Sequence, residues 1–353
     1  MVFGGCYSGE VVRVAPNEVV FSTPQAALDI YNAAAMGRET WVKTDLMDFG
    51  TGDGGFIWEE DPIKRREVAK KIVPAFSTKA VRAKQATVHM YIDLFVDKMK
   101  EIGGKAEGVE ITKWLLWLSV DMSADLTYGR EMHQMRDEKN SVFLETLLGT
   151  NLLGTLMQVS KKFPLLSPLA LLFTSPKLLK LLSKFSKLNS EEVQKRIDNR
   201  GMTKHPDFFD YMLPANSPAP TSKKQKVHLE QVAFQLFIAG FDPVQITFYG
   251  CLFFLVKEPS VYANLVGEIR TEFQSYSDIT PESLVNLEYL QAFIQETFRM
   301  YYPGATGFPR RSPGATVDGI YVPKGLLRNH SQFALFPRPA QLPSRALVAK
   351  GPS

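Results

Sequence analysis

The run of residues 229–258, LEQVAFQLFIAGFDPVQITFYGCLFFLVKE, constrains the fold of this chain more than any other stretch. It follows a basic, Pro/Ser-rich linker, closes at Glu258-Pro259, and is apolar nearly throughout. Because it lacks the polar stripe of a surface helix, it predicts one long helix that is buried on most of its circumference. A helix of this kind lies at the centre of a helical core.

The middle of this run contains residues that are unusual inside a buried helix. Pro243 removes the N–H that would bond the carbonyl of Ala239, which costs about 3 kcal/mol and predicts a kink. Gly240 leaves its backbone open to close approach, and Asp242 needs a partner or a water because a buried, unpaired carboxylate is costly. Two interpretations stay open from these residues alone. Either Asp242 caps a loop or pairs with a lysine in a kinked core helix, or the cluster is the floor of a ligand pocket.

Composition narrows the function classes. The 353 residues are 45% hydrophobic, enough for a large core, and 41 Lys and Arg against 37 Asp and Glu give a net charge of only +4. This charge is mild and dispersed, and no nucleic-acid-binding motif is present, so nucleic acid is not an expected partner. The 2 cysteines, Cys6 and Cys251, exclude a disulfide framework and a zinc site of clustered thiolates. The sequence predicts neither a signal peptide nor a membrane span.

Periodicity and capping signals predict a mainly helical chain with small β-sheets, an α+β fold. The expected elements before the long helix are a hairpin over 10–21, helices over 25–31, 58–77, 78–102 and 111–128, and an aperiodic loop over 32–57. After it we expect helices over 260–273 and 281–302 and a strand–turn–strand over 315–323. The predicted organisation is a leader (1–9), one domain (10–325) and an aperiodic tail (326–353) that we expect to be disordered.

Two charged segments each allow more than one interpretation. The helix over 58–77 carries basic residues, which on their own indicate a solvated face: Lys64, Arg65, Arg66, Lys70 and Lys71. The segment 163–188 alternates Pro-broken apolar pieces with a lysine-bearing amphipathic part. It is either a surface helix pair with a lid-like loop or a face that dips into a membrane surface.

Taken in chain order, several motifs resemble those of a cytochrome P-450 of the fungal microsomal type, a haem-thiolate monooxygenase. VVRVAPNEVVFSTPQAALDIY resembles the first sheet hairpin and the helix after it, DPIKRREVAKKIVPAFS the C helix, and VDMSADLTYG the E helix. IAGFDPVQIT resembles the centre of the distal I helix, and YLQAFIQETFRMYYPGATGFPRR the K helix with its Glu-x-x-Arg motif. Each motif is weak alone, but their order and separations match the family over most of residues 10–325.

The resemblance implies roles for individual residues. Gly240 and Asp242 are then the distal oxygen and proton relay, where the family usually follows the acid with Thr and this chain has Pro243. The resemblance further assigns Arg65 and Arg310 to the haem propionates, a task that suits a guanidinium group. Glu296 and Arg299 become the buried ion pair beneath the haem.

The resemblance also shows departures. The family needs a loop of the form Phe-x-x-Gly-x-Arg-x-Cys-x-Gly, whose thiolate binds iron, and this sequence contains none. Cys6 precedes the first strand, and Cys251 lies on the long helix about 13 Å beyond Asp242, so it is expected to be a small buried hydrophobe. The fold is therefore expected to be incomplete, truncated at both ends and without the Cys loop, the L helix and the last strands. We expect no axial metal ligand and no activity from the chain as given.

The resemblance implies haem as cofactor, a small apolar substrate, a cytochrome reductase that docks on the basic helix, and peripheral membrane contact through 163–188. The family is found on the cytosolic face of the endoplasmic reticulum membrane. This chain shows no membrane anchor, so a cytoplasmic or peripheral location is expected. The alternative functions are a non-catalytic remnant that acts as a binding or regulatory module and, less well supported, an all-helical lipid carrier.

Overall fold

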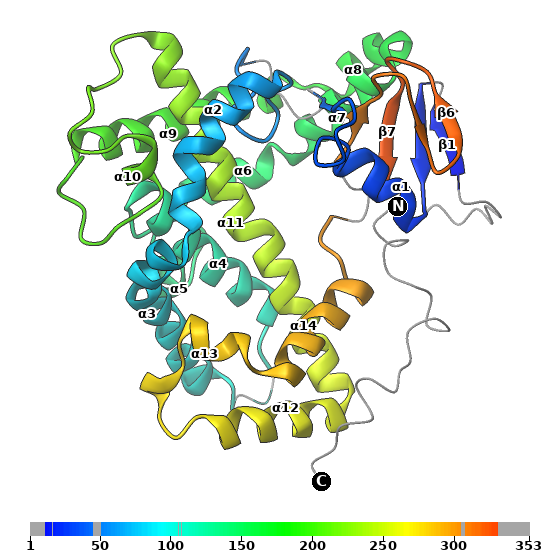
Figure 1. Cartoon of the computed structure of the whole chain (residues 1–353). Helices are drawn as coiled ribbons and strands as arrows, with labels where there is room; N and C mark the ends of the chain where they lie inside the picture. Colours follow the sequence, from blue (N-terminus) through cyan, green and yellow to red (C-terminus); the bar gives the residue numbers. More distant parts are fainter. Residues whose placement is uncertain are drawn as a thin grey trace. The chain divides into compact units, whose positions relative to one another are not determined.

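The computed structural model describes residues 11–330 except 16, 45–50, 105, 107 and 305–307. The chain forms two compact units, one of residues 45–249 and the other of residues 1–44 together with 250–353. Both units can be followed by colour in Figure 1, where the colours follow the sequence. The predicted leader with Cys6 and residues 331–353 of the predicted tail lie outside the described residues.

The unit of residues 45–249 is helical throughout its described part. Its elements are α2 (Pro62–Ile72), η1 (Val73–Phe76), α3 (Thr78–Ile102), α4 (Ile111–Tyr128), α5 (Gln134–Asp137), α6 (Val142–Gly149), α7 (Asn151–Lys162), η2 (Pro164–Leu166), α8 (Ser167–Phe173), α9 (Pro176–Asp198), α10 (Phe209–Met212) and most of α11 (Lys223–Lys257). The predicted long helix is confirmed as α11, which begins a few residues earlier than expected and runs without interruption through Pro243. The prediction that it is buried on most of its circumference is wrong for this structure, since 22% of its apolar 18-residue window is buried and the buried residues of the helix lie mainly at 232–237.

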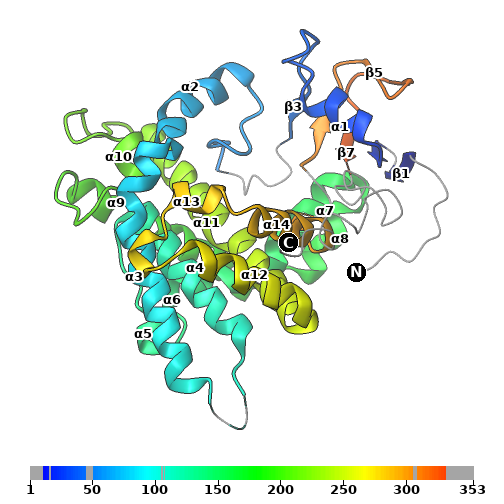
Figure 2. The ribbon, with the colours of Figure 1, turned by 60° about the horizontal axis from the view of Figure 1, so that its bottom comes forward.

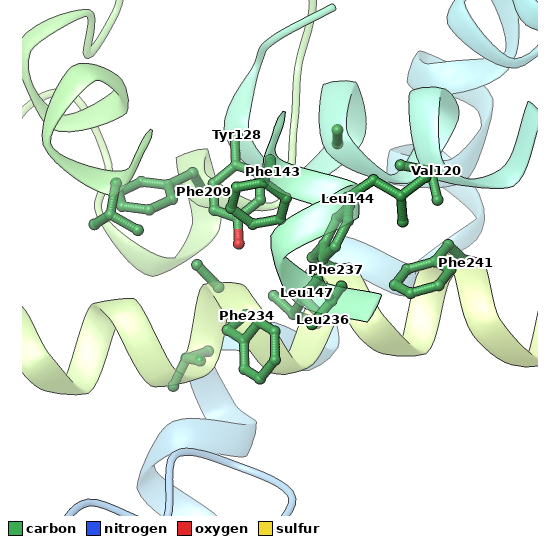
Figure 3. Close-up of a cluster of buried hydrophobic side chains, with 14 of the residues drawn as sticks. Val120, Tyr128, Phe143, Leu144, Leu147, Phe209, Phe234, Leu236, Phe237 and Phe241 are labelled. Atoms are coloured by element: carbon green, nitrogen blue, oxygen red, sulfur yellow. The ribbon is translucent and has the colours of Figure 1, made fainter. Parts of the chain in front are cut away.

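The core of this unit forms where α11 packs against α4 and α6, and aromatic side chains dominate it (Figure 3). Phe237 of α11 is fully buried and meets Phe143 edge to face, with ring centroids 5.4 Å apart. Its ring also lies 5.8 Å from Tyr128 of α4. Since each fully buried large side chain contributes about 1.5–3 kcal/mol, this cluster supplies much of the stability of the unit.

The helix predicted over 58–77 is shorter than expected. The Asp61 carboxylate accepts from the Ile63 N–H at 2.8 Å and caps α2, and Pro62 fills its first position. Pro74 then forces the 3-10 turn η1 before Ser77 caps α3. The predicted helix over 111–128 is confirmed as α4, which ends at Gly129 in the left-handed conformation, φ +62°.

After the end of α11, the other unit carries four helical segments: α12 (Pro259–Glu272), η3 (Tyr276–Asp278), α13 (Pro281–Val285) and α14 (Glu288–Met300). The single helix predicted over 281–302 is thus two helices, since α13 ends at Val285 and α14 begins at Glu288 with its own cap. That cap comes from α12, where the Glu268 carboxylate accepts from the N–H groups of Tyr289 (2.8 Å) and Leu290 (2.9 Å). α12 and α14 pack side by side (Figure 2).

The same unit holds two small sheets. The five-stranded sheet has the order β1 (Val11–Ala15), β2 (Glu18–Phe21), β7 (Leu327–His330), β4 (Arg310–Arg311) and β3 (Val42–Lys43), and β2 and β7 pair in parallel. The predicted hairpin and strand–turn–strand are confirmed as β1–β2 and as β5 (Ala315–Val317) with β6 (Ile320–Val322). Residues 327–330, which sequence analysis assigned to the tail, form β7 between β2 and β4.

One helix links the two sheets. Helix α1 (Pro24–Tyr31) is capped by Thr23, as the sequence predicts, and packs on β5. The hydroxyl of Thr23 also donates to the Asp318 carboxylate at 2.6 Å, in the turn between β5 and β6. The α1 cap thus ties the two small sheets of this unit together.

Two helical segments of the described chain are long and apolar enough to cross a membrane by length and composition alone: Val142–Lys162 and Lys223–Lys257. The sequence contains no apolar stretch of this length that is also uncharged, which is the stricter condition behind the prediction of no membrane span. The buried central helix of a soluble protein also meets the length and composition condition.

Candidate functional site

Gly240 lies where α11 crosses α4. A Cβ added there would overlap Ser123 Oγ of α4 and lie 3.1 Å from Ser123 Cβ. The Ser123 hydroxyl in turn donates to the Phe237 carbonyl at 2.7 Å, which joins the two helices. The structure therefore gives Gly240 a packing role, because only glycine lets the helices approach this closely. The oxygen-approach role inferred from the resemblance is a separate proposal.

Asp242 is exposed, and its carboxylate has no hydrogen bond or ion pair to any described residue. Desolvation by the surrounding protein raises the pKa of Asp242 above its ordinary value. The first interpretation was that Asp242 caps a loop or pairs with a lysine. In the described part of the chain Asp242 has no such partner. An unpaired carboxyl group with a raised pKa is suited to hold and pass on a proton.

Pro243 stands inside α11, so the Ala239 carbonyl lacks the N–H donor that a regular helix would supply. The helix nevertheless continues, and the Thr247 hydroxyl donates to the Pro243 carbonyl at 2.7 Å in the next turn. Tertiary packing of α11 therefore outweighs the local penalty of the proline.

Arg65 lies half-buried on α2, in the same unit as Asp242. Its guanidinium group has no hydrogen bond, ion pair or ring contact with the described residues. A half-buried guanidinium group without a protein partner is suited to an anionic ligand group.

Glu296 and Arg299 form the predicted ion pair on α14. Arg299 donates through Nε to Glu296 Oε2 at 2.7 Å and through a terminal nitrogen to Oε1 at 2.5 Å. The hydrogen bonds to Glu296 raise the pKa of Arg299. The Arg299 side chain is 14% exposed and that of Glu296 35%, so the pair is only partly buried.

Arg310 lies on β4 with its guanidinium carbon 5.1 Å from the centre of the Tyr31 ring. One terminal nitrogen also donates to the carbonyls of Phe308 (3.2 Å) and Pro309 (3.1 Å). Arg310 is therefore fixed by its own unit, in contrast to Arg65. Arg65, Gly240 and Asp242 belong to one compact unit, while Glu296, Arg299 and Arg310 belong to the other.

Cys251 is half-buried, and its thiol lies 3.7 Å from Thr297 Oγ1 of α14. Burial raises the pKa of the Cys251 thiol, and the contact with Thr297 opposes this only in part. A thiol held in the neutral form is a poor metal ligand, which agrees with the packing role that the sequence predicts.

Sequence reasoning missed the side chains that bind the segment 51–58 to α11, since it treated 32–57 as an aperiodic loop. Gln235 and His228 make these contacts, and both stand in the apolar helix or just before it. They lie about two turns apart on one helix, which is the only signal in the sequence that could have pointed to them.

A protein-family model described as cytochrome P450 matches residues 11–332. The chain belongs to the cytochrome P450 family. The P450 monooxygenase TwmD of Talaromyces wortmannii is 43% identical over 328 residues, which are 93% of this chain and 64% of that protein. The trichothecene C-4 hydroxylase of Trichoderma arundinaceum is 29% identical over 316 residues, 88% of this chain and 61% of that protein. The chain thus spans less than two thirds of the length of these relatives.

Solved P450 structures share the fold. A cytochrome P450 crystal structure (CYP102L1) matches with a TM-score of 0.74 at 20% identity and covers 93% of this chain and 74% of that chain. The cytochrome P450DA heme domain matches with a TM-score of 0.72 at 15% identity, over 95% of this chain and 70% of that chain. The predicted fold class, mainly helical with small β-sheets, is confirmed.

The P450 family implies haem, and the described residues fit it only in part. Arg65 is free to pair with a propionate, and Asp242 offers a proton-holding group. Cys251 lies half-buried against Thr297 of α14, and burial raises the pKa of its thiol, which suits packing better than ligation of the haem iron. Within the described residues no group of three or more His, Cys, Asp and Glu side chains could hold a metal ion.

Proposed function

We propose that this chain carries the distal and propionate-binding parts of a haem-dependent monooxygenase that oxidises an apolar small molecule in fungal secondary metabolism. Asp242 carries the proposal, because it is an unpaired carboxyl group with a raised pKa in the middle of the long core helix of a P450 chain. The names of the relatives support the reaction class, since one is a monooxygenase and another a C-4 hydroxylase.

In this proposal Arg65 and Arg310 bind the two propionates of the haem, and Asp242 holds a proton at its carboxyl group. Haem, when held by a thiolate, supplies the oxidising chemistry. The Glu296–Arg299 pair stabilises α14 and the start of the segment that leads to Arg310.

The proposed function is tested with two proteins. The first is the 353-residue chain. The second is the same chain joined after residue 332, where the match to the family model ends, to a P450 segment that carries a loop of the form Phe-x-x-Gly-x-Arg-x-Cys-x-Gly. We expect the fusion to bind haem with the spectrum of a thiolate-ligated carbonyl complex and to form oxidised products with a reductase. The chain alone should do neither. A thiolate spectrum from the chain alone would show that it is not inactive as given, and a fusion that folds but binds no haem would contradict the monooxygenase assignment.

We further propose that the basic face of α2 docks an acidic cytochrome reductase. Lys64, Arg66, Lys70 and Lys71 are exposed and make no ion pair with described residues. Changing Lys64, Lys70 and Lys71 to Glu should weaken reductase binding roughly tenfold at low salt, and less at high salt. Surface plasmon resonance measures this, with Lys100→Glu on α3 as the control. Equal losses in the control and the triple variant would remove α2 from the docking surface.

A membrane contact through residues 163–188, at the cytosolic face of the endoplasmic reticulum, is part of the same proposal. Leu165 is 96% exposed and Leu172 and Phe173 are 79% and 66% exposed, next to the exposed lysines of α9. Apolar side chains flanked by lysines suit an anionic bilayer surface. Replacing Leu172 and Phe173 by Ser should reduce co-sedimentation with anionic vesicles several-fold. The control is Ile63→Ser, on α2, and vesicle binding that is unchanged in the double variant would exclude this contact.

A further inference from the structure

The segment of residues 51–58, called here the strap, is fixed to α11 by one buried side chain. Gln235 is 3% exposed, and its Oε1 accepts from the N–H groups of Phe56 (2.7 Å) and Ile57 (2.7 Å). Its Nε2 donates to the Gly54 carbonyl at 2.9 Å. A single amide thus satisfies three backbone groups of the strap, and none of these bonds involves a group that titrates. This set of bonds is the inner latch.

Gly55 fits the inner latch in two independent ways. Its φ of +57° is left-handed, and an added Cβ would lie 2.6 Å from Gln235 Nε2. Gly52 shares the left-handed conformation, with φ +72°, but an added Cβ there meets nothing within 4 Å. An alanine at either position would strain the backbone, but only an alanine at 55 would also displace the Gln235 side chain. Comparing the two substitutions therefore distinguishes these effects.

A second contact fixes the outer half of the strap. His228, about two turns before Gln235 on α11, places Nδ1 2.9 Å from Asp53 Oδ1 and 3.1 Å from Oδ2. The same carboxylate accepts from the Gly55 N–H at 2.8 Å. Burial raises the pKa of Asp53, but the hydrogen bonds from His228 and Gly55 outweigh it and leave the pKa below its ordinary value. This contact of His228 with the Asp53 carboxylate is the outer latch.

The outer latch borders a cavity within the same unit. The cavity has a volume of about 770 Å³ and is lined by Gly52, Asp53 and His228 at one side. Val68 of α2 and Met212 of α10 also line it and are 8% and 7% exposed. Gln235 does not line it. Because Asp53 and His228 both line the cavity, release of the outer latch alone would open this part of the cavity wall while the inner latch keeps the strap on α11.

We propose that the strap is a two-latch gate: the outer Asp53–His228 latch opens separately to admit small molecules to this cavity, while the inner Gln235 latch keeps α2 in place. The strap leads directly into α2, so the inner latch preserves the position of the helix that carries Arg65. The gate is a property of the folded chain and does not depend on haem or on the proposed reaction.

Asp53 gives the outer latch a pH dependence of defined sign. A carboxyl group whose pKa is lowered in the folded state stabilises that state above its unfolded pKa, near 3.9, and loses this contribution as the pH falls. The outer latch should therefore open below about pH 4, while the inner latch persists. The other titratable or charged groups that line the cavity around His228 are Glu59 on the strap side, Lys64, Glu67 and Lys71 on α2, Tyr211 on α10 and Lys224 on α11.

Hydrogen exchange at individual amides tests the gate, because the Gly55 N–H reports the outer latch and the Phe56 and Ile57 N–H groups report the inner one. We expect His228→Phe to raise exchange at Gly55 roughly tenfold and to leave Phe56 and Ile57 within twofold. Gln235→Leu should raise exchange at all three. The matched control is His205→Phe, which removes a histidine that lies 3.0 Å from the Asp125 carboxylate, away from the strap.

Two further measurements make the result decisive. Gly55→Ala should reproduce Gln235→Leu, while Gly52→Ala should leave the Phe56 and Ile57 amides protected. The second measurement uses Met212→Cys as a probe in a chain whose two cysteines are replaced by Ser. The rate at which maleimide labels this cysteine should rise when His228→Phe is added and stay the same when His205→Phe is added. Equal increases at Gly55, Phe56 and Ile57 in His228→Phe would show that the strap opens as one piece and overturn the two-latch gate. Unchanged labelling would overturn the link to the cavity.

Discussion

Replacing Arg196 with Met should lower the free energy of unfolding of the helical unit by about 3–5 kcal/mol, because it leaves a buried carboxylate without its cation. The Arg196 side chain is 1% exposed and that of Asp207 0%. Arg196 donates to the two oxygens of Asp207 at 2.6 and 3.0 Å and to Asp210 at 2.5 Å. Burial already raises the pKa of Asp207 in the native chain. Without Arg196, the protein must either keep that charge in a dry site or protonate it.

Urea unfolding monitored by tryptophan fluorescence measures the loss, since Trp114 and Trp117 lie in the core of this unit. The matched control is Lys204→Met, which removes a cation from an exposed pair with Glu131 and should cost under about 1 kcal/mol. The double variant Arg196→Met/Asp207→Leu should recover part of the loss, because apolar pairs replace buried ion pairs at little cost. A loss for Arg196→Met no larger than that of Lys204→Met would contradict the buried position of this cluster.

Local signals in the sequence were enough to predict most helices and hairpins. They failed where an element forms only by contact with a distant segment of the chain. Thr23 with Pro24 and Gly129 mark the start of α1 and the end of α4 as predicted. The extent of α2 was overestimated because the periodic charge pattern hid the cap at Asp61. β7 could not be predicted, since its pairing with β2 and β4 depends on backbone partners far away in the chain and on no pattern of its own.

The candidate site was predictable at the level of residue types but not of contacts. Glu296 and Arg299 are three residues apart on one helix, so their pairing follows from helix geometry. The unpaired state of Arg65 and Asp242 could not be read from the sequence, because it depends on the absence of partners on neighbouring helices. The crossing of α4 over Gly240 was equally hidden, since nothing in the motif names Ser123 as the neighbour.

Replacing Gly240 with Ala should destabilise the helical unit by about 1–3 kcal/mol, since the new methyl group would overlap Ser123 Oγ at the α4–α11 crossing. In an ordinary helix interior the same change stabilises by about 0.5–1 kcal/mol. Gly267 of α12 supplies that control, because an added Cβ there meets nothing within 4 Å. Opposite signs for Gly240→Ala and Gly267→Ala in urea unfolding would show that packing, and not helix propensity, selects the glycine at 240.

A double-mutant cycle then assigns the effect to one contact. Ser123→Ala removes the hydroxyl that donates to the Phe237 carbonyl and should cost about 0.5–1.5 kcal/mol alone. It also removes the atom that the new methyl group would overlap. The free energy of unfolding lost in the double variant should therefore be smaller than the sum of the two single losses by at least about 0.5 kcal/mol. Strict additivity, or a Gly240→Ala chain as stable as the native one, would mean that helix packing does not require glycine there. Only then does the approach of a ligand to the α11 backbone become the better reason for glycine at position 240.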